Sequence, residues 1–203
     1  PFVASDGGVT WRVQTEDRPL VSPAASSEVL PLLPLLLTVG RGAEGPVLLD
    51  LEAVGSLALD GSGEDVLGAL THLVAESVLA PWADGVEVLL VGFEPDIARR
   101  LELLGPDRVT AVSELDASLL RVLEMRSSRV AAAGDRLRTR IRGSDVDATD
   151  EVRPPLLVVH AAQPSPAHAE QLAALVPEGG RVGVAVVALA PWSGARAIWT
   201  LGE

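Results

Sequence analysis

The sequence predicts an α/β domain with a mainly parallel sheet and helices on both of its faces. Two runs, Val86–Phe93 and Leu156–Ala161, are almost wholly apolar, as is typical of parallel strands that are buried on both sides. Between Asp65 and Val78 the apolar residues recur at helical spacing, and later segments repeat that pattern. Buried strands that alternate with amphipathic helices indicate a parallel sheet with helices packed against both faces.

The first 34 residues differ in character from the rest. They contain Pro19, Pro23 and the small-residue run Ala24–Ser27, with one short strand expected at Val9–Val13. Proline and clustered small residues of this kind predict loops. We therefore expect residues 1–34 to form an arm or linker that packs on a core made by residues 35–203.

No membrane span is expected in this chain. The most apolar stretch, Val29–Val39, has eleven residues and is interrupted by Pro31 and Pro34, whereas a span needs roughly 20. The start at Pro1 also lacks the basic region of a signal peptide. We expect a cytoplasmic domain, or the soluble part of a membrane-associated protein, that belongs to a longer chain.

The core is expected to begin with a β-hairpin and a strand–helix unit. Apolar runs at Leu35–Val39 and Pro46–Leu51 flank a Gly-rich connection, which predicts the hairpin. A short strand at Ser56–Leu59 leads into Asp60-Gly61-Ser62-Gly63, and Asp65 is expected to cap the helix that follows.

The second half alternates helices with strands and ends in an expected hairpin. A long helix is expected from Ser113 to Arg142, with Leu115, Leu119 and Val122 on its buried side. The other expected elements are a helix at 95–104, a strand at 108–112, a helix at 166–175, and a closing β-hairpin of 181–189 with 195–201.

The composition excludes several classes of function. A formal net charge of −12 opposes binding to nucleic acid and to anionic membrane surfaces. The chain has no Cys, which excludes disulfides and thiolate chemistry. All 16 basic residues are Arg, so a P-loop lysine, a Schiff base and a Ser–Lys pair are excluded as well.

One region carries the opposite charge. From Arg121 to Arg142 there are seven arginines and only two acids, Glu124 and Asp135. We expect a solvated helix face here. A docking surface for an acidic partner is the alternative.

The order of the elements from Leu35 to Glu203 resembles the motor domain of the FtsK/SpoIIIE translocases and of the related type VII secretion ATPases. That family has a hydrophobic strand, a Gly-Ser-Gly-Lys-Ser loop and a helix, and Leu57–Asp65 is similar to the strand and loop. The family's other strands are similar to Val86–Pro95, to Leu156–Ala161 at the Walker B position, and to Val182–Leu189 and Ala195–Leu201. The resemblance implies a RecA-type, P-loop-like fold.

The residues that handle ATP in that family are replaced here. Within the P-loop match, Asp60-Gly61-Ser62-Gly63-Glu64-Asp65, an acid stands at the Lys position (Glu64) and another at the Mg²⁺-binding Ser position (Asp65). The first motif glycine falls on Ala58. At the Walker B position, His160 and Ala161 replace the metal-binding Asp and the water-activating Glu. Carboxylates repel a triphosphate, so we expect no ATP hydrolysis and no cofactor.

Two other interpretations of these residues stay open. The helix start after Gly63 offers amides and a dipole that favour anions, so the domain could bind a nucleotide without hydrolysing it. His160 ends a buried strand at the sheet edge where α/β sites lie, so an unrelated α/β enzyme could be centred on it. We expect His160 to be structural, and Glu64 and Asp65 to be caps rather than metal ligands.

A second resemblance concerns the segment Gly45–Gly92, which contains Leu49-Asp50-Leu51-Glu52-Ala53-Val54-Gly55. It is similar to a segment of large actinobacterial membrane-associated proteins that also carry LysM and BTAD-type modules, and the use of Arg alone is typical of a GC-rich genome. We expect an inert ATPase-like domain used for protein–protein contact or regulation. Its partner would be another protein or another domain of the same polypeptide.

Overall fold

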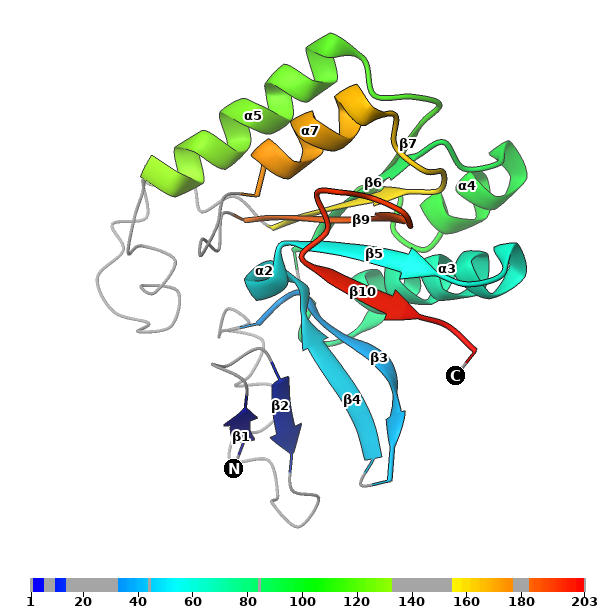
Figure 1. Ribbon diagram of the computed structural model, residues 1–203, viewed down its shortest axis with the longest axis vertical. Coiled ribbons are helices and arrows are strands. Elements are labelled where there is room, and N and C mark those ends of the chain that lie inside the picture. Colours follow the sequence, from blue (N-terminus) through cyan, green and yellow to red (C-terminus); the bar gives the residue numbers. More distant parts are fainter. Residues whose placement is uncertain are drawn as a thin grey trace.

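A six-stranded sheet lies at the centre of the protein, a computed structural model of which is shown in Figure 1. The structure describes residues 2–5, 10–13, 33–43, 45–83, 85–132, 155–176 and 183–202; for 2–5, 10–13 and 129–132 only the backbone is considered. The strand order is β10-β5-β9-β8-β6-β7, and every neighbouring pair is parallel. The strands are β5 (Ser56–Asp60), β6 (Glu87–Val91), β7 (Val109–Val112), β8 (Leu156–His160), β9 (Val184–Leu189) and β10 (Ala197–Thr200).

Helices cover both faces of this sheet, as the sequence predicts (Figure 1). On one face, α3 (Gly63–Leu79) and α4 (Pro95–Glu102) pack on the cluster that contains Leu59 and Leu157. On the other face, α5 (Ala117–Ala132) and α7 (Pro166–Ala174) pack on the cluster that contains Val158 and Val186. The central strands are apolar on both faces because both faces are buried, which removes the period-2 alternation of a half-exposed strand.

A second sheet of four antiparallel strands lies beside the first, in the order β1-β2-β4-β3. The predicted hairpin is confirmed as β3 (Leu36–Gly42) with β4 (Gly45–Asp50), and the strand expected near Val9 is confirmed as β2 (Thr10–Val13). A strand that was not predicted, β1 (Phe2–Ser5), pairs with β2. The division of the chain at residue 34 stays a prediction.

Side chains of α3 and of the turn after it bind the outer edge of β3. The backbone N–H of Thr38 donates to Glu76 Oε2 at 2.6 Å, and the Thr38 hydroxyl donates to Glu76 Oε1 at 2.7 Å. The Thr38 carbonyl lies 3.1 Å from His72 Nε2, and the Leu36 carbonyl accepts from Trp82 Nε1 at 2.8 Å. These bonds attach the hairpin to the helix layer of the main sheet.

The closing hairpin predicted for 181–189 and 195–201 is wrong. β10 does not pair with β9; it runs parallel to β5, which separates β10 from β9 in the sheet. The intervening segment fixes this path, because the Ser56 hydroxyl donates to the Gly194 carbonyl at 2.8 Å and Trp192 is buried. The chain thus crosses β5 before the last strand begins.

Two predicted helix features are also corrected. The long helix begins at Ala117 rather than near Ser113, with Asp116 Oδ1 accepting the N–H of Leu119 at 2.7 Å. Its buried side contains Leu120 and Leu123, whereas Val122 is 52% exposed. The part predicted beyond residue 132 lies outside the described residues. For α3, the cap is Ser62 and not Asp65, because the helix begins three residues earlier than expected.

A one-turn helix, α2 (Leu51–Val54), connects β4 to β5 and ends at a glycine that cannot be replaced without strain. Gly55 has φ 79°, and a Cβ there would lie 2.1 Å from Cγ1 of Val176. Its N–H donates to Leu51 O, and its carbonyl accepts from Val186. The turn therefore positions β5 next to β9.

We expect Gly55→Ala to lower the free energy of unfolding by about 2–4 kcal/mol, from backbone strain and overpacking. Gly68→Ala is the matched control, since Gly68 lies in α3 and a Cβ there meets nothing within 4 Å. That change should raise the free energy of unfolding by about 0.5–1 kcal/mol, because glycine is unfavourable inside a helix. Urea unfolding followed by circular dichroism measures both, and equal effects of the two changes would contradict the role given to Gly55.

Candidate functional site

The predicted site residues come together at one edge of the main sheet. Asp60 ends β5 and His160 ends β8. Both strands are parallel and only β9 lies between them, so the two strand ends are roughly 10 Å apart across the sheet. Carboxyl ends of parallel strands are where α/β folds place their sites. The two predicted segments thus end at the same edge of the sheet.

The connection from β5 to α3 is short, because β5 stays paired through its last residue. The ladder to β10 runs from Leu57↔Ala197 to Asp60↔Thr200. On the two sides of the strand, Asp60 O accepts from Leu201 N and Leu59 O accepts from Ala190 N, each at 2.8 Å. Between the end of β5 at Asp60 and the start of α3 at Gly63 there remain only two residues.

Ser62 fixes the first turn of α3. Its Oγ accepts the N–H of Asp65 at 3.3 Å, its hydroxyl donates to Asp65 Oδ2 at 2.5 Å, and its carbonyl accepts from Val66 N at 2.9 Å. Ser62 and Asp65 thus bind each other across the helix start. A Cβ at Gly61 would lie 3.0 Å from the Cβ of Leu201, so the residue that follows β10 packs against the turn.

The side chains around this turn are acidic and exposed. Asp60, Glu64 and Asp65 all lie on the surface, and Glu64 and Asp65 stand in the first turn of α3. Acids in a first turn interact favourably with the helix dipole. Within the described residues no group of three or more His, Cys, Asp or Glu side chains is placed to hold a metal ion. The turn therefore presents negative charge to solvent.

His160 is a buried side chain on the face of the sheet covered by α5 and α7. It is 8% exposed, and its Nδ1 lies 2.8 Å from the carbonyl of Ala162 and 3.3 Å from the N–H of the same residue. Burial lowers the pKa of His160, an effect opposed by the Ala162 carbonyl and reinforced by the nearby His168. The imidazole at this bend of the backbone therefore resists protonation more than a free histidine does.

Ala161 follows His160 and contributes backbone bonding only. Its N–H donates to the carbonyl of Val91 at 2.9 Å, which extends the contact between β8 and β6 beyond the strand end. With a methyl side chain it has no group that accepts a proton from water. The position where the resembled family has its water-activating acid is therefore part of the sheet edge here.

The arginine-rich stretch is described only in part. Arg121 is exposed, in agreement with a solvated helix face. Arg126 instead donates to Glu87 Oε2 at 2.5 Å, and its side chain is 11% exposed. The arginines from 129 onward lie outside the residues whose side chains are described.

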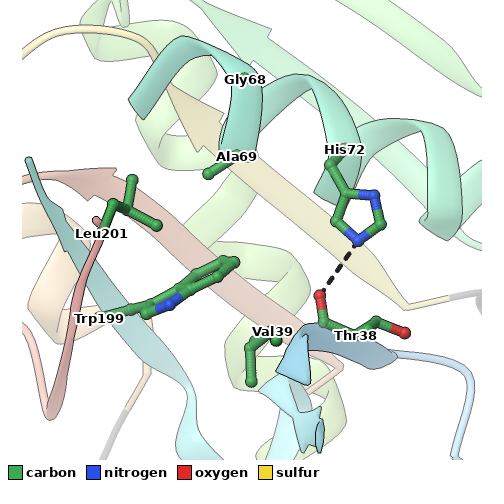
Figure 2. Close-up of a pocket in the computed structure, with 8 residues that line it drawn as sticks. Thr38, Val39, Gly68, Ala69, His72, Trp199 and Leu201 are labelled. Atoms are coloured by element: carbon green, nitrogen blue, oxygen red, sulfur yellow. Dashed lines mark hydrogen bonds between the residues drawn. The ribbon is translucent and has the colours of Figure 1, made fainter. Parts of the chain in front are cut away.

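A surface cleft next to β10 was missed by the sequence reasoning. It has a volume of about 320 Å³ and lies between β3, α3 and the last strand (Figure 2). Figure 2 shows the Trp199 ring at its base, with Ala69 and Leu201 on one side and His72 bonded to Thr38 on the other. Its lining residues come from 38–40, 68–72 and 199–201. No single stretch of sequence signals it.

These features define the class of the domain: an α/β fold with a six-stranded parallel sheet, helices on both faces and a strand–turn–helix unit at its carboxyl edge. Among solved structures, the chain is similar to the cytoplasmic domain of the type VII secretion ATPase EccC from Thermomonospora curvata, with a TM-score of 0.56 and 19% identity over 81% of this chain and 22% of that one. The cytoplasmic domain of EssC matches with a TM-score of 0.39 and 15% identity, over 89% of this chain and 34% of that one.

The likeness to EccC confirms the predicted resemblance at the level of the fold. The chain spans about a fifth of the length of the EccC structure and about a third of that of EssC. Models of known protein families and curated protein sequences give no match to this chain. No helix among the described residues has the length and apolar character that crossing a membrane requires.

We expect the lowered pKa of His160 to make folding stability rise with pH near the ordinary histidine value of 6.5. Below that pH the unfolded chain binds a proton that the folded chain resists, so the free energy of unfolding falls as the pH drops from 8 to 5.5. The change His160→Gln should reduce this dependence. His72→Gln, which leaves His160 and its contacts in place, is the control and should retain it. Urea unfolding across this pH range measures it; an unchanged slope in His160→Gln would contradict the assignment.

Proposed function

We propose that the domain is an inactive ATPase-like fold that serves protein–protein contact or regulation within a larger cytoplasmic protein. The observation that carries this proposal is the continuous pairing of β5 through Asp60. A phosphate-binding loop uses the backbone N–H groups of a Gly-rich segment to surround the phosphates. Here the positions matched to that segment, Leu59 and Asp60, belong to a strand that pairs with β10 on its outer side.

The charges at the turn support the same proposal. A working P-loop has a Lys that reaches the β- and γ-phosphates and a Ser or Thr that holds Mg²⁺. Glu64 and Asp65 stand at these positions and are exposed, so they repel a triphosphate. Asp65 is also bonded to Ser62, which fixes its carboxylate inside the helix start.

The residues at the end of β8 support the proposal as well. His160 is buried and hydrogen-bonded to Ala162, and Ala161 has no carboxylate. A metal-bound nucleotide and an activated water need acids at this strand end. The fold likeness to EccC therefore supports a shared architecture, and the residues of this chain support a use other than hydrolysis.

We expect isothermal titration with ATP and Mg²⁺ to give no binding heat at millimolar nucleotide, and phosphate-release assays to give no turnover. A functional ATPase serves as the positive control. The double change Glu64→Lys with Asp65→Ser restores the charge pattern without changing the strand pairing, and we expect it to gain no hydrolysis. Micromolar ATP binding by the wild-type chain would overturn the proposal and favour a nucleotide-binding module.

A further inference from the structure

Two of the strand edges in this structure are blocked by groups of the chain itself. At β7, the carbonyls of Arg108 and Val112 face β6, since they accept from Val88 N and Gly92 N. Because orientation alternates along a strand, Val109 and Ala111 direct their N–H groups outward, away from β6. The N–H of Val109 donates to Gly105 O at 2.8 Å and that of Ala111 donates to Glu102 Oε1 at 3.1 Å. An added strand finds no donor here.

The edge of β3 is blocked by side chains. The N–H and carbonyl of Thr38 bind Glu76 and His72, and the carbonyl of Leu36 accepts from Trp82. These bonds occupy the outward backbone groups in the buried part of the strand. Blocking exposed edges with side chains is a known means of preventing unwanted strand pairing.

The edge at β10 differs from both. The N–H of Leu201, directly after β10, faces β5, because it donates to the carbonyl of Asp60. Ala197 and Trp199 alternate in step with Leu201 and therefore face β5 as well. The backbone groups of Ile198 and Thr200, which lie between them, are directed away from β5. In the part of the chain that the structure describes, no side chain is shown bonded to these outward groups.

The surroundings of β10 suit an extended chain. On the α3 side, Trp199 and Leu201 border the cleft of about 320 Å³, which is lined mainly by apolar groups (Figure 2). On the other side, Ile198 is 67% exposed, an unusual state for an apolar residue in a strand. The two faces of an added strand would thus each meet an apolar contact next to β10.

Negative charge next to β10 indicates which kind of segment could bind at its edge. At the carboxyl end of β10, Thr200 pairs with Asp60, and Glu64 follows in the first turn of α3; both acids are exposed. A strand added to β10 would lie roughly 10 Å from β5, within reach of a long basic side chain directed at these carboxylates. A second copy of this chain is disfavoured, because each copy has a formal net charge of −12.

We propose that the β10 edge is a docking site for an extended, basic segment of a partner protein, which adds to the sheet as a further strand. An apolar side chain of that segment enters the cleft beside Trp199, and an Arg or Lys pairs with Asp60 and Glu64. This is β-augmentation, in which backbone bonds supply affinity and alternate side chains supply specificity. The inference rests on the proposed role in protein contact and assigns the surface that performs it.

The test uses two labelled heptapeptides of alternating threonine and valine, one flanked by Arg and the other by Glu, in fluorescence anisotropy titrations of the full chain. The Arg-flanked peptide should bind at least ten-fold more tightly than the Glu-flanked one at low salt, and the difference should shrink in 0.5 M salt. The variant Asp60→Asn with Glu64→Gln should lose this preference. Absence of binding of the Arg-flanked peptide to the wild-type chain would overturn the proposal.

A backbone variant tests strand addition itself. Ile198→Pro removes one outward N–H, and proline is tolerated on an edge strand where the N–H faces solvent. It should weaken binding of the Arg-flanked peptide at least ten-fold, whereas Ile198→Thr, which keeps the N–H, should change it less than three-fold. Near-ultraviolet circular dichroism of the Trp residues checks the fold. If Ile198→Pro does not fold, the charge variant decides the result.

Two results contradict the inference without touching the proposed lack of ATPase activity. Equal binding of the peptide by folded Ile198→Pro and by the wild-type chain would show that β10 is not the contact. Sedimentation velocity that finds a wild-type dimer lost in Ile198→Pro would show that the edge pairs with a second copy. The ATP titrations are independent of both measurements, so the failure of one proposal leaves the other intact.

Discussion

A backbone N–H group in a strand can bond to a neighbouring strand or to a bound anion. In this chain the backbone groups of β5 bond to the neighbouring strands. The strand pairs with β9 on one side and with β10 on the other, and the β10 ladder continues to Asp60. Because the helix begins at Gly63, only Gly61 and Ser62 lie between the strand and the helix. The negative charges of Glu64 and Asp65, like the paired backbone of β5, disfavour a bound anion at this turn. The placement of β10 and the character of the turn are thus two consequences of a single pairing.

The need of backbone groups for hydrogen-bond partners also explains how the two sheets are held together. An unpaired buried N–H costs about 1–3 kcal/mol, so the edge of β3 needs partners when it packs near α3. Glu76 provides two acceptor oxygens to Thr38, and Trp82 donates to Leu36. These bonds satisfy the edge and at the same time fix the hairpin next to the helix. The open end of this arrangement is the cleft between β3 and β10, which exists because the two sheets contact α3 without pairing with each other.

The sequence predicted the central strands because strands buried on both faces appear as continuous apolar runs, as in Val86–Phe93. It also predicted that His160 ends a buried strand at the sheet edge where α/β sites lie. It predicted a strand at 195–201 but paired it with β9 instead of β5, because a half-buried strand that follows β9 closely along the chain has the same pattern as a hairpin partner. The face of α5 was misjudged because Leu119 and Leu120, and Val122 and Leu123, are adjacent apolar pairs that fit two helical registers. Ser62 and Asp65 are both capping residue types, and only the length of β5 decides between them.

A change of charge sign at a sheet edge alters what the edge attracts, and it does so with the fold intact. Glu64 and Asp65 stand where an ATPase of the resembled family needs a cation and a neutral hydroxyl, and Asp60 adds a third acid at the same turn. Loss of the lysine alone would leave this sheet edge without a charge. A carboxylate at the lysine position makes the edge negative, so that it attracts basic groups. That attraction lies next to the strand whose outward backbone groups are open, and the two features together define a surface for an extended basic chain. In this chain the residues that oppose a triphosphate are therefore the same residues that favour a basic peptide.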